Sequence, residues 1–150
     1  MPSATRGDLA FWDTSGLVLL CVHQPATHQA RRLAQAHGRF AIWWGAPIEA
    51  RSSFARLLRD RVLAASDMAI CLARLASLRR AAIEVVPSEE VRDLAETMVD
   101  RFDIRAADSL QLAAALVLHH QKPRGRPFIC FDRRLGLAAG SAGFAVLPRP

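Results

Sequence analysis

Four short apolar runs, separated for the most part by longer stretches with helical periodicity, limit the folds that this chain can adopt. The runs span residues 9–12, 40–44, 128–131 and 144–147. They are rich in aromatic residues and hardly alternate with polar ones, which is typical of strands buried on both faces. Long connections favour parallel pairing, because parallel strands need a crossover. The order predicts an α/β protein, a three-layer α/β/α sandwich with a mainly parallel central sheet.

The segments between these runs carry helix signals. Gly38 follows a helix predicted over residues 28–37, and Pro47 suits the first turn of the next helix. Ser88 is a predicted N-cap with two glutamates behind it, and a further helix is predicted from about residue 106 to residue 119. No repeat or linker interrupts the chain, so a single domain over residues 1–150 is expected.

Composition and cysteine usage indicate a cytoplasmic protein. The chain is 51% hydrophobic, yet no apolar stretch reaches the length of a membrane span. Arg6, Asp8 and Asp13 surround or interrupt the first apolar stretch, which argues against a signal peptide. The cysteines show no metal-binding spacing and are interpreted as small buried hydrophobic residues: Cys21, Cys71 and Cys130.

The formal net charge of +6 comes almost wholly from arginine, since Lys122 is the only lysine. Arginine suits bidentate contacts to phosphate, and a basic chain favours polyanionic partners. A solvated surface in an arginine-rich proteome explains the same charge, so both readings remain open.

Acidic residues follow the predicted strands. Asp13 ends the first run, Asp132 ends the run 128–131, and Glu49 lies in the first turn of the helix opened by Pro47. Ligands of open parallel sheets bind beyond the carboxyl ends of the strands. We therefore expect these three acids near one edge of one sheet.

Asp108 is the fourth candidate. Between residues 106 and 118 every other residue is apolar or neutral, and helical rotation places Asp108 on the face of Leu112 and Ala115. A carboxylate on so apolar a helix is costly unless a cation or several donors compensate its charge.

Together these acids predict a metal centre. Two carboxylates at 4 Å repel each other by roughly 4 kcal/mol at an effective dielectric constant of 20, so a cluster of them needs cations. Oxygen ligands without histidine or thiolate point to Mg²⁺ or Mn²⁺ rather than zinc. Such ions support the hydrolysis of phosphodiesters.

Each acid alone also has a structural explanation. Asp13 could cap the following helix, Glu49 is favourable in any first helical turn, and Asp132 could be a capping or salt-bridged acid. Asp108 is the hardest to explain in this way. The set is more specific than its members, because nothing in packing alone gathers acids at one edge.

Four residues outside the set of acids also bear on the function. Arg56 lies two turns after Glu49 on the same helical face and is a candidate phosphate contact. Trp43 and Trp44 could stack on bases, but core packing is favoured because they close an apolar strand. His119 is interpreted as a helix-end histidine favoured by the helix dipole, too far from Asp108 to be a metal ligand.

The segments around the four acids resemble those of the PIN-domain ribonucleases, and especially of the VapC-type toxins of bacterial toxin–antitoxin pairs. The similar segments occur in the family's order and cover nearly the whole chain. They are Phe-Trp-Asp13-Thr14-Ser15-Gly-Leu; Pro-Ile-Glu49 with Ser52 and Ser53 behind it; Arg-Ala-Ala-Asp108-Ser-Leu-Gln-Leu-Ala-Ala-Ala; and Phe-Ile-Cys-Phe-Asp132-Arg-Arg-Leu followed by Gly-Phe-Ala-Val.

The resemblance implies a PIN fold with one or two Mg²⁺ or Mn²⁺ ions and cleavage of single-stranded or looped RNA to a 3′-hydroxyl and a 5′-phosphate. It also implies a homodimer, silenced by a cognate antitoxin as the toxin of a type II pair. Asp13 and Asp108 would be the main metal ligands, Glu49 would hold metal or water, and Asp132 would complete the site. Thr14 or Ser15 would supply a hydroxyl behind the ligands.

One departure from the family pattern concerns Cys130. Many members have a threonine two residues before the fourth acid, so this chain lacks a hydroxyl there. Three functions are compatible with these residues: a metal-dependent endoribonuclease, a PIN-like module that binds RNA or a partner with little or no cleavage, and a metal-dependent DNA nuclease or phosphatase. Metal-dependent cleavage of RNA, compared with Asp13→Asn and Asp108→Asn, discriminates among them.

Overall fold

A parallel sheet forms the centre of the computed structural model, which describes residues 9–150. Arg6 and Asp8, on which part of the signal-peptide argument rests, lie outside the described residues. The strands are β1 (Leu9–Trp12), β2 (Arg39–Trp43), β3 (Ile83–Val85), β4 (Pro127–Ile129) and β5 (Ala145–Leu147). They pair in the order β3-β2-β1-β4-β5, and every pairing is parallel.

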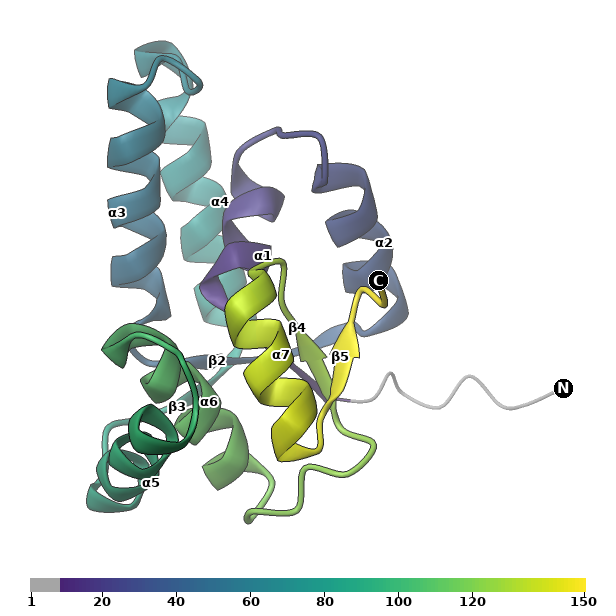
Figure 1. The fold of residues 1–150 in the computed structure, drawn as a ribbon. Coiled ribbons are helices and arrows are strands. Elements are labelled where there is room, and N and C mark those ends of the chain that lie inside the picture. The colour runs from purple at the N-terminus through teal and green to yellow at the C-terminus, as the bar shows by residue number, and fades with distance from the viewer. Residues whose placement is uncertain (1–8) are drawn as a thin grey trace, which may run out of the picture.

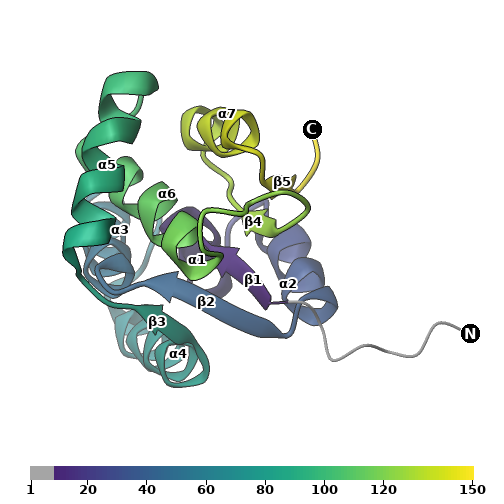
Figure 2. The ribbon, with the colours of Figure 1, turned by 90° about the horizontal axis from the view of Figure 1, so that it is seen from below.

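Helices cover both faces of this sheet, as Figures 1 and 2 show. One layer holds α1 (Thr14–Cys21), α2 (Thr27–Ala36), α3 (Ala46–Arg59) and α4 (Met68–Ala81), with a short 3-10 helix at Ala65–Asp67. The other holds α5 (Glu89–Arg101), α6 (Ala106–Leu118) and α7 (Arg133–Ala142). The predicted α/β/α sandwich with its parallel sheet is therefore confirmed.

The predicted strands match four of those observed, with small shifts at their ends. β1 has the predicted bounds, whereas β4 stops at Ile129 and leaves Cys130 and Phe131 in the connection to Asp132. The strand missed from the sequence is β3, an edge strand of three residues in which only Val85 is buried. Its Ile-Glu-Val sequence has no apolar run to mark it.

The core lies around β1, the central strand. Ala10, Phe11 and Trp12 are fully buried, because β2 and β4 flank β1 and helices cover both of its faces. The ring of Phe11 stacks on that of Phe128 in β4 at 5.4 Å between centroids. The small side chains of α6 from residue 113 to residue 115 are also fully buried, so α6 packs closely on the sheet. This packing fixes the carboxyl ends of β1 and β4 relative to α6.

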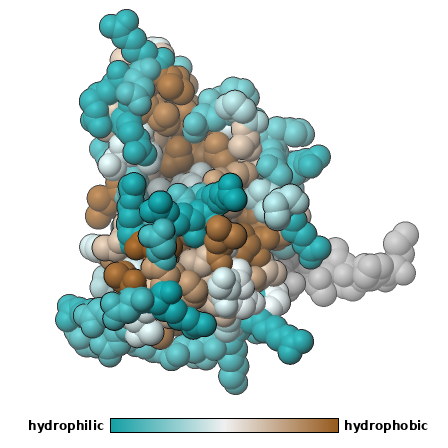
Figure 3. Space-filling model, in the orientation of Figure 1, coloured by the Kyte–Doolittle hydropathy of each residue, from teal (hydrophilic) through white to brown (hydrophobic). Residues whose placement is uncertain are grey.

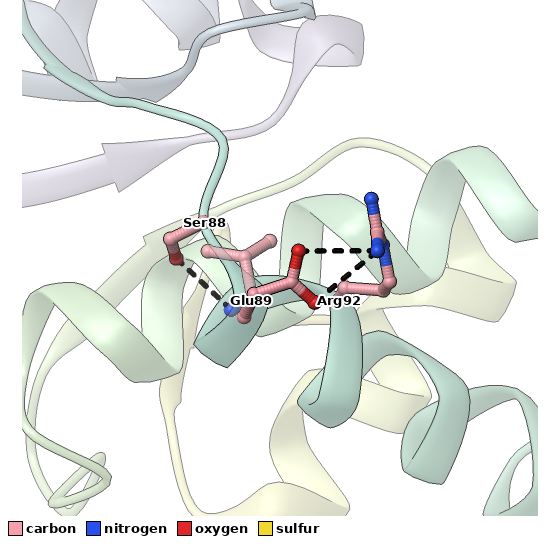
Figure 4. Close-up of polar contacts among 4 residues, drawn as sticks. Ser88, Glu89 and Arg92 are labelled. Atoms are coloured by element: carbon pink, nitrogen blue, oxygen red, sulfur yellow. Dashed lines mark hydrogen bonds and ion pairs between the residues drawn. The ribbon is translucent and has the colours of Figure 1, made fainter.

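Ser88 caps α5 as predicted (Figure 4). Its hydroxyl accepts a hydrogen bond of 3.1 Å from the amide of Val91. Glu89 follows in the first turn and pairs with Arg92, one turn further on, at 3.1 Å. These contacts satisfy a free amide and place negative charge at the positive end of the helix.

The interpretation of the cysteines is confirmed, since Cys21, Cys71 and Cys130 are buried free thiols. Across residues 9–150, every helix falls short of the length and apolar character that crossing a bilayer requires.

Candidate active site

The predicted acids gather at the carboxyl edge of the sheet. Asp13 directly follows β1, and its amide donates to the carbonyl of Ile129 at 2.9 Å, which extends the pairing of β1 with β4. Glu49 lies in the first turn of α3, just beyond β2. Asp108 lies in the first turn of α6, and Asp132 precedes α7. Four separate elements thus deliver one carboxylate each.

Asp13 is the most enclosed of the four, with 4% of its surface exposed. Its Oδ2 accepts hydrogen bonds from the hydroxyl of Ser15 at 2.6 Å and from the amide of Ser15 at 3.2 Å. Burial raises the pKa of Asp13 to about 6; the hydrogen bonds from Ser15 oppose the rise, and the charge of Asp108 adds to it. The carboxyl group is therefore held in place by donors but is costly to ionise without a cation.

Glu49 is half-buried and held at both carboxylate oxygens. Thr14 donates to Oε2 at 3.3 Å, and the amide nitrogen of Gln111 donates to Oε1 at 3.3 Å. Burial raises the pKa of Glu49 to about 7, and the charge of Asp13 adds to the rise. The hydrogen bonds from Gln111 and Thr14 oppose it.

Asp108 is half-buried at the start of α6. Burial raises its pKa, and the charge of Asp132 raises it further, whereas the backbone amide of Arg105 and the charges of Arg105 and Arg134 lower it. A carboxylate on so apolar a helix needs compensation for its charge. The structure supplies part of it through two arginines at a distance rather than through an ion pair.

Asp132 is exposed and caps α7. Its Oδ1 accepts the amide of Leu135 at 2.8 Å, so this oxygen is engaged in the N-cap. The structural explanation of Asp13 and Asp132 as helix caps is confirmed, because each side chain caps the helix that follows it. Capping explains neither the position of Glu49 nor that of Asp108.

One open cavity of about 1090 Å³ contains all four acids on its walls. Within the described chain none of the four forms an ion pair with an arginine. Hydrophilic side chains gather over the N-terminal end of α7, on the face drawn in Figure 3. Other polar and charged residues of the cavity wall are Thr14, Ser15, Gln24, Ser52, Ser53, Arg56, Arg105 and Arg134.

The carboxylate oxygens of the four acids suit a hard divalent cation, but the side chains are not arranged as a complete metal site. The four carboxylates offer only oxygen, which fits Mg²⁺ or Mn²⁺. Asp13 and Glu49 have pKa values raised toward neutrality, first by burial and then by the charges of neighbouring acids, which is the situation that a cation relieves. Among residues 9–150, however, no group of three or more histidine, cysteine, aspartate or glutamate side chains is arranged to hold a metal ion. The residues fit the ion in their chemistry, and binding would require their side chains to close around it.

Arg56 lines the cavity, as its helical position predicted, but sequence reasoning missed two further arginines and one amide. Arg105 lies directly before α6, three residues before Asp108, and Arg134 lies two residues after Asp132. Their closeness in sequence to predicted acids is the signal that could have identified both arginines. Gln111 lies one helical turn after Asp108 and bonds to both Thr14 and Glu49. Its polar side chain inside an apolar helix was visible in the sequence.

The interpretations of Trp43, Trp44 and His119 from the sequence are confirmed only in part. Trp43 is buried in the core as expected, whereas Trp44 is 46% exposed, so the packing interpretation is wrong for Trp44. Neither ring lines the acidic cavity. His119 ends α6 as expected, but burial and then the charges of Arg126 and His120 lower its pKa, which disfavours the cation that the helix dipole would stabilise.

The fold and this edge define a three-layer α/β/α protein with an acidic cavity flanked by arginines at the carboxyl ends of its parallel strands. The chain is similar in structure to FitAcB from Neisseria gonorrhoeae, with a TM-score of 0.54 over 92% of this chain and 95% of that chain. The two sequences are 17% identical, so the likeness establishes the fold alone. No protein-family model and no curated protein sequence matches the chain.

Proposed function

We propose that this protein is a Mg²⁺- or Mn²⁺-dependent endoribonuclease of the PIN type that acts as the toxin of a type II toxin–antitoxin pair. One observation carries the proposal. Carboxylates from four separate elements line one cavity, and none of them forms an ion pair with an arginine of residues 9–150, whereas three arginines lie on the wall of the same cavity. The motif resemblance to VapC-type toxins supports the toxin role, and the fold shared with FitAcB agrees with the architecture that this resemblance implies.

Asp13 and Asp108 would be the main metal ligands, with Glu49 holding metal or water and Asp132 completing the site. When bound, the ion would supply an activated water and would stabilise the charge that develops at the phosphorus. Ser15 would keep Asp13 oriented through its 2.6 Å hydrogen bond. Thr14 would do the same for Glu49.

The arginines would bind the substrate backbone. Arg56 comes from α3, Arg105 from the start of α6, and Arg134 from α7, so they stand on different parts of the cavity wall. Guanidinium groups pair with phosphate in a bidentate manner, which would orient the strand across the carboxylates. Single-stranded or looped RNA fits this arrangement best, because an unpaired strand can bend into a cavity.

The experiment is a cleavage assay with purified protein on single-stranded and structured RNA, in Mg²⁺, in Mn²⁺ and in EDTA. We expect metal-dependent cleavage by the native protein and a loss of at least about 100-fold in Asp13→Asn and Asp108→Asn, since each removes a ligand. Asp93→Asn is the matched control, because Asp93 is an exposed acid on α5 away from the cavity. Equal cleavage by all four proteins would refute the site assignment.

A second candidate is a PIN-like module that binds RNA or a partner protein and cleaves little. The absence of a ready metal-binding group among residues 9–150 favours it. Tight RNA binding with no cleavage in either metal would support this candidate. Cleavage of DNA or small phosphoesters, with RNA untouched, would instead indicate a nuclease or phosphatase of another specificity.

Homodimerisation, a cognate antitoxin and a cytoplasmic location complete the proposal. The buried thiols are compatible with a reducing compartment. Co-expression with the protein encoded by the neighbouring reading frame, followed by size-exclusion chromatography and the same cleavage assay, tests the partner. A stable complex that no longer cleaves RNA is the expected result.

A further inference from the structure

Gln111 is a polar side chain in an apolar part of α6. Its sequence neighbours from residue 110 to residue 118 are otherwise all apolar, and the Gln111 side chain is fully buried. Burying a primary amide costs free energy unless its donors and its acceptor are paired. The position of Gln111 therefore needs a specific reason.

The amide nitrogen of Gln111 closes a ring of hydrogen bonds with Thr14 and Glu49. Nε2 donates to the hydroxyl of Thr14 at 2.8 Å and to Oε1 of Glu49 at 3.3 Å. Thr14 in turn donates to Oε2 of Glu49 at 3.3 Å. Both carboxylate oxygens of Glu49 are thus tied to groups on two other helices.

This ring joins the two helical layers of the sandwich. Thr14 begins α1 and Glu49 lies on α3, both in one layer, whereas Gln111 comes from α6 in the other layer. Thr14 and Glu49 line the cavity, but Gln111 stands behind them and does not. Gln111 can therefore affect the cavity only through these two side chains.

The carbonyl end of the Gln111 side chain does not stabilise the fold. Oε1 of Gln111 has no hydrogen-bond partner among residues 9–150. Reversing the amide would set its carbonyl oxygen against the carboxylate of Glu49, so the nitrogen is the atom that must face it. An unpaired buried acceptor destabilises the folded chain, so packing alone gives no reason for an amide at this position. A residue that costs stability while it organises polar groups at a cavity is typical of a functional site.

We propose that Gln111 is a positioning residue that fixes the carboxylate of Glu49, directly and through Thr14, in the orientation presented to the cavity. It touches neither substrate nor metal. The inference rests on the proposed function for the role of Glu49, but the orientation of Glu49 can be measured without any activity.

The test compares Gln111→Met, Glu49→Gln and the double variant with the native protein. Methionine is unbranched and of similar length, and it removes both donated hydrogen bonds. We expect Gln111→Met to lower the affinity for Mn²⁺ by about 10- to 100-fold, as the loss of groups behind metal ligands commonly does. The melting temperature of each variant in EDTA checks that it is folded at the temperature of the titration. Mn²⁺ affinity is measured by calorimetric titration, and kcat on RNA is measured at saturating Mn²⁺.

The double variant separates positioning from a general structural effect. If Gln111 acts through Glu49, the double variant is no worse than Glu49→Gln alone, whereas independent effects would add. Ser109→Ala is the control on the same helix, since Ser109 is buried and, among residues 9–150, its hydroxyl bonds only to the carbonyl of Ala106. It should leave Mn²⁺ affinity and kcat unchanged.

One further measurement depends neither on nuclease activity nor on metal binding. The side-chain carboxyl resonance of Glu49 in ¹³C-labelled protein should shift or broaden in Gln111→Met and stay in place in Ser109→Ala. An unchanged resonance, or additive losses in the double variant, would overturn the inference. If the native protein takes up no Mn²⁺ and cleaves no RNA while the resonance responds as expected, the proposed function fails and the positioning role of Gln111 stands.

Discussion

The hydroxyl of Ser15 donates a hydrogen bond of 2.6 Å to Oδ2 of Asp13, the most buried acid of the cavity. The same hydroxyl accepts the backbone amide of Phe131 at 2.9 Å. Ser15 thereby ties the residue that ends β1 to the segment that leads from β4 to Asp132. One short side chain sets the relative position of two acid-bearing strand ends.

Ser15→Ala should therefore lower stability as well as activity. It removes a donor from a buried carboxylate and leaves the Phe131 amide without its partner, which we expect to cost about 1–3 kcal/mol of unfolding free energy. Urea denaturation followed by circular dichroism measures this. Ser66→Ala, at an exposed serine of the short 3-10 helix, should change stability by less than about 0.5 kcal/mol. Equal effects of the two substitutions would contradict the role of Ser15.

Gly16 should not tolerate a side chain. A Cβ at this position would lie 2.8 Å from Cε3 of Trp12, whose ring is fully buried and cannot move aside. Overpacking of this kind costs about 1–3 kcal/mol, so Gly16→Ala should lower the melting temperature by several degrees. Gly38→Ala is the matched control, because a Cβ there meets no atom within 4 Å. A melting temperature unchanged by Gly16→Ala would show that the Trp12 ring has room to shift.

The stability of the metal-free protein should fall as the pH rises from about 4 to 7. Burial raises the pKa of Asp13 from 3.8 to about 6 and that of Glu49 from 4.5 to about 7, so in this window the folded chain holds protons that the unfolded chain has lost. Stability decreases with pH wherever the native state binds more protons. Melting temperatures in EDTA across this window measure the effect.

Asp13→Asn removes one of these titrations, so its melting temperature should fall less across the same pH window. Adding millimolar Mn²⁺ at pH 7.5 should raise the melting temperature of the native protein, because the ion binds only the folded site. It should raise that of Asp13→Asn much less. Identical pH profiles for the two proteins would refute the raised pKa of Asp13.

Arg56→Ala should weaken RNA binding without regard to sequence. The logarithm of the association constant falls linearly with the logarithm of the salt concentration. We expect this dependence to become less steep by about 0.7, the value for one phosphate contact on a single strand. Binding is measured in EDTA with the Asp108→Asn protein, so that cleavage does not interfere. Arg31→Ala, at an exposed arginine of α2 outside the cavity, should leave the slope unchanged. If both substitutions act alike, the cationic character of the whole surface and not Arg56 controls binding.

Cys130 should contribute a weak donor between Asp13 and Asp132. Its Sγ lies 3.2 Å from the carbonyl oxygen of Asp132 and 3.7 Å from Oδ2 of Asp13. Burial and the charge of Asp13 raise the pKa of the thiol, which therefore keeps its proton. Cys130→Val should reduce kcat on RNA about 2- to 10-fold, the equivalent of one modest hydrogen bond, whereas Cys130→Thr should retain activity. An equal kcat for the two variants would show that this position acts through packing alone.

Local sequence signals predicted much of the fold. The apolar runs located β1, β2, β4 and β5 within two residues, and Ser88 and Gly38 marked helix ends, because these features depend on neighbours along the chain. β3 escaped detection because a three-residue edge strand with one buried side chain carries no such signal. Its place in the sheet comes from pairing with β2.

The sequence by itself determined which residues end the strands and begin the helices, and hence that Asp13, Glu49 and Asp132 approach one edge of a parallel sheet. It marked Asp108 as an acid that needs compensation, and the packing of α6 brings this acid to the same cavity. Only the tertiary structure decided what surrounds them. The pairing of Gln111 with Thr14 and Glu49, the bridge from Ser15 to Phe131, and the three arginines on the cavity wall depend on how helices from two layers are rotated against the sheet. That rotation results from the packing of side chains distant in sequence, which periodicity along one chain does not specify.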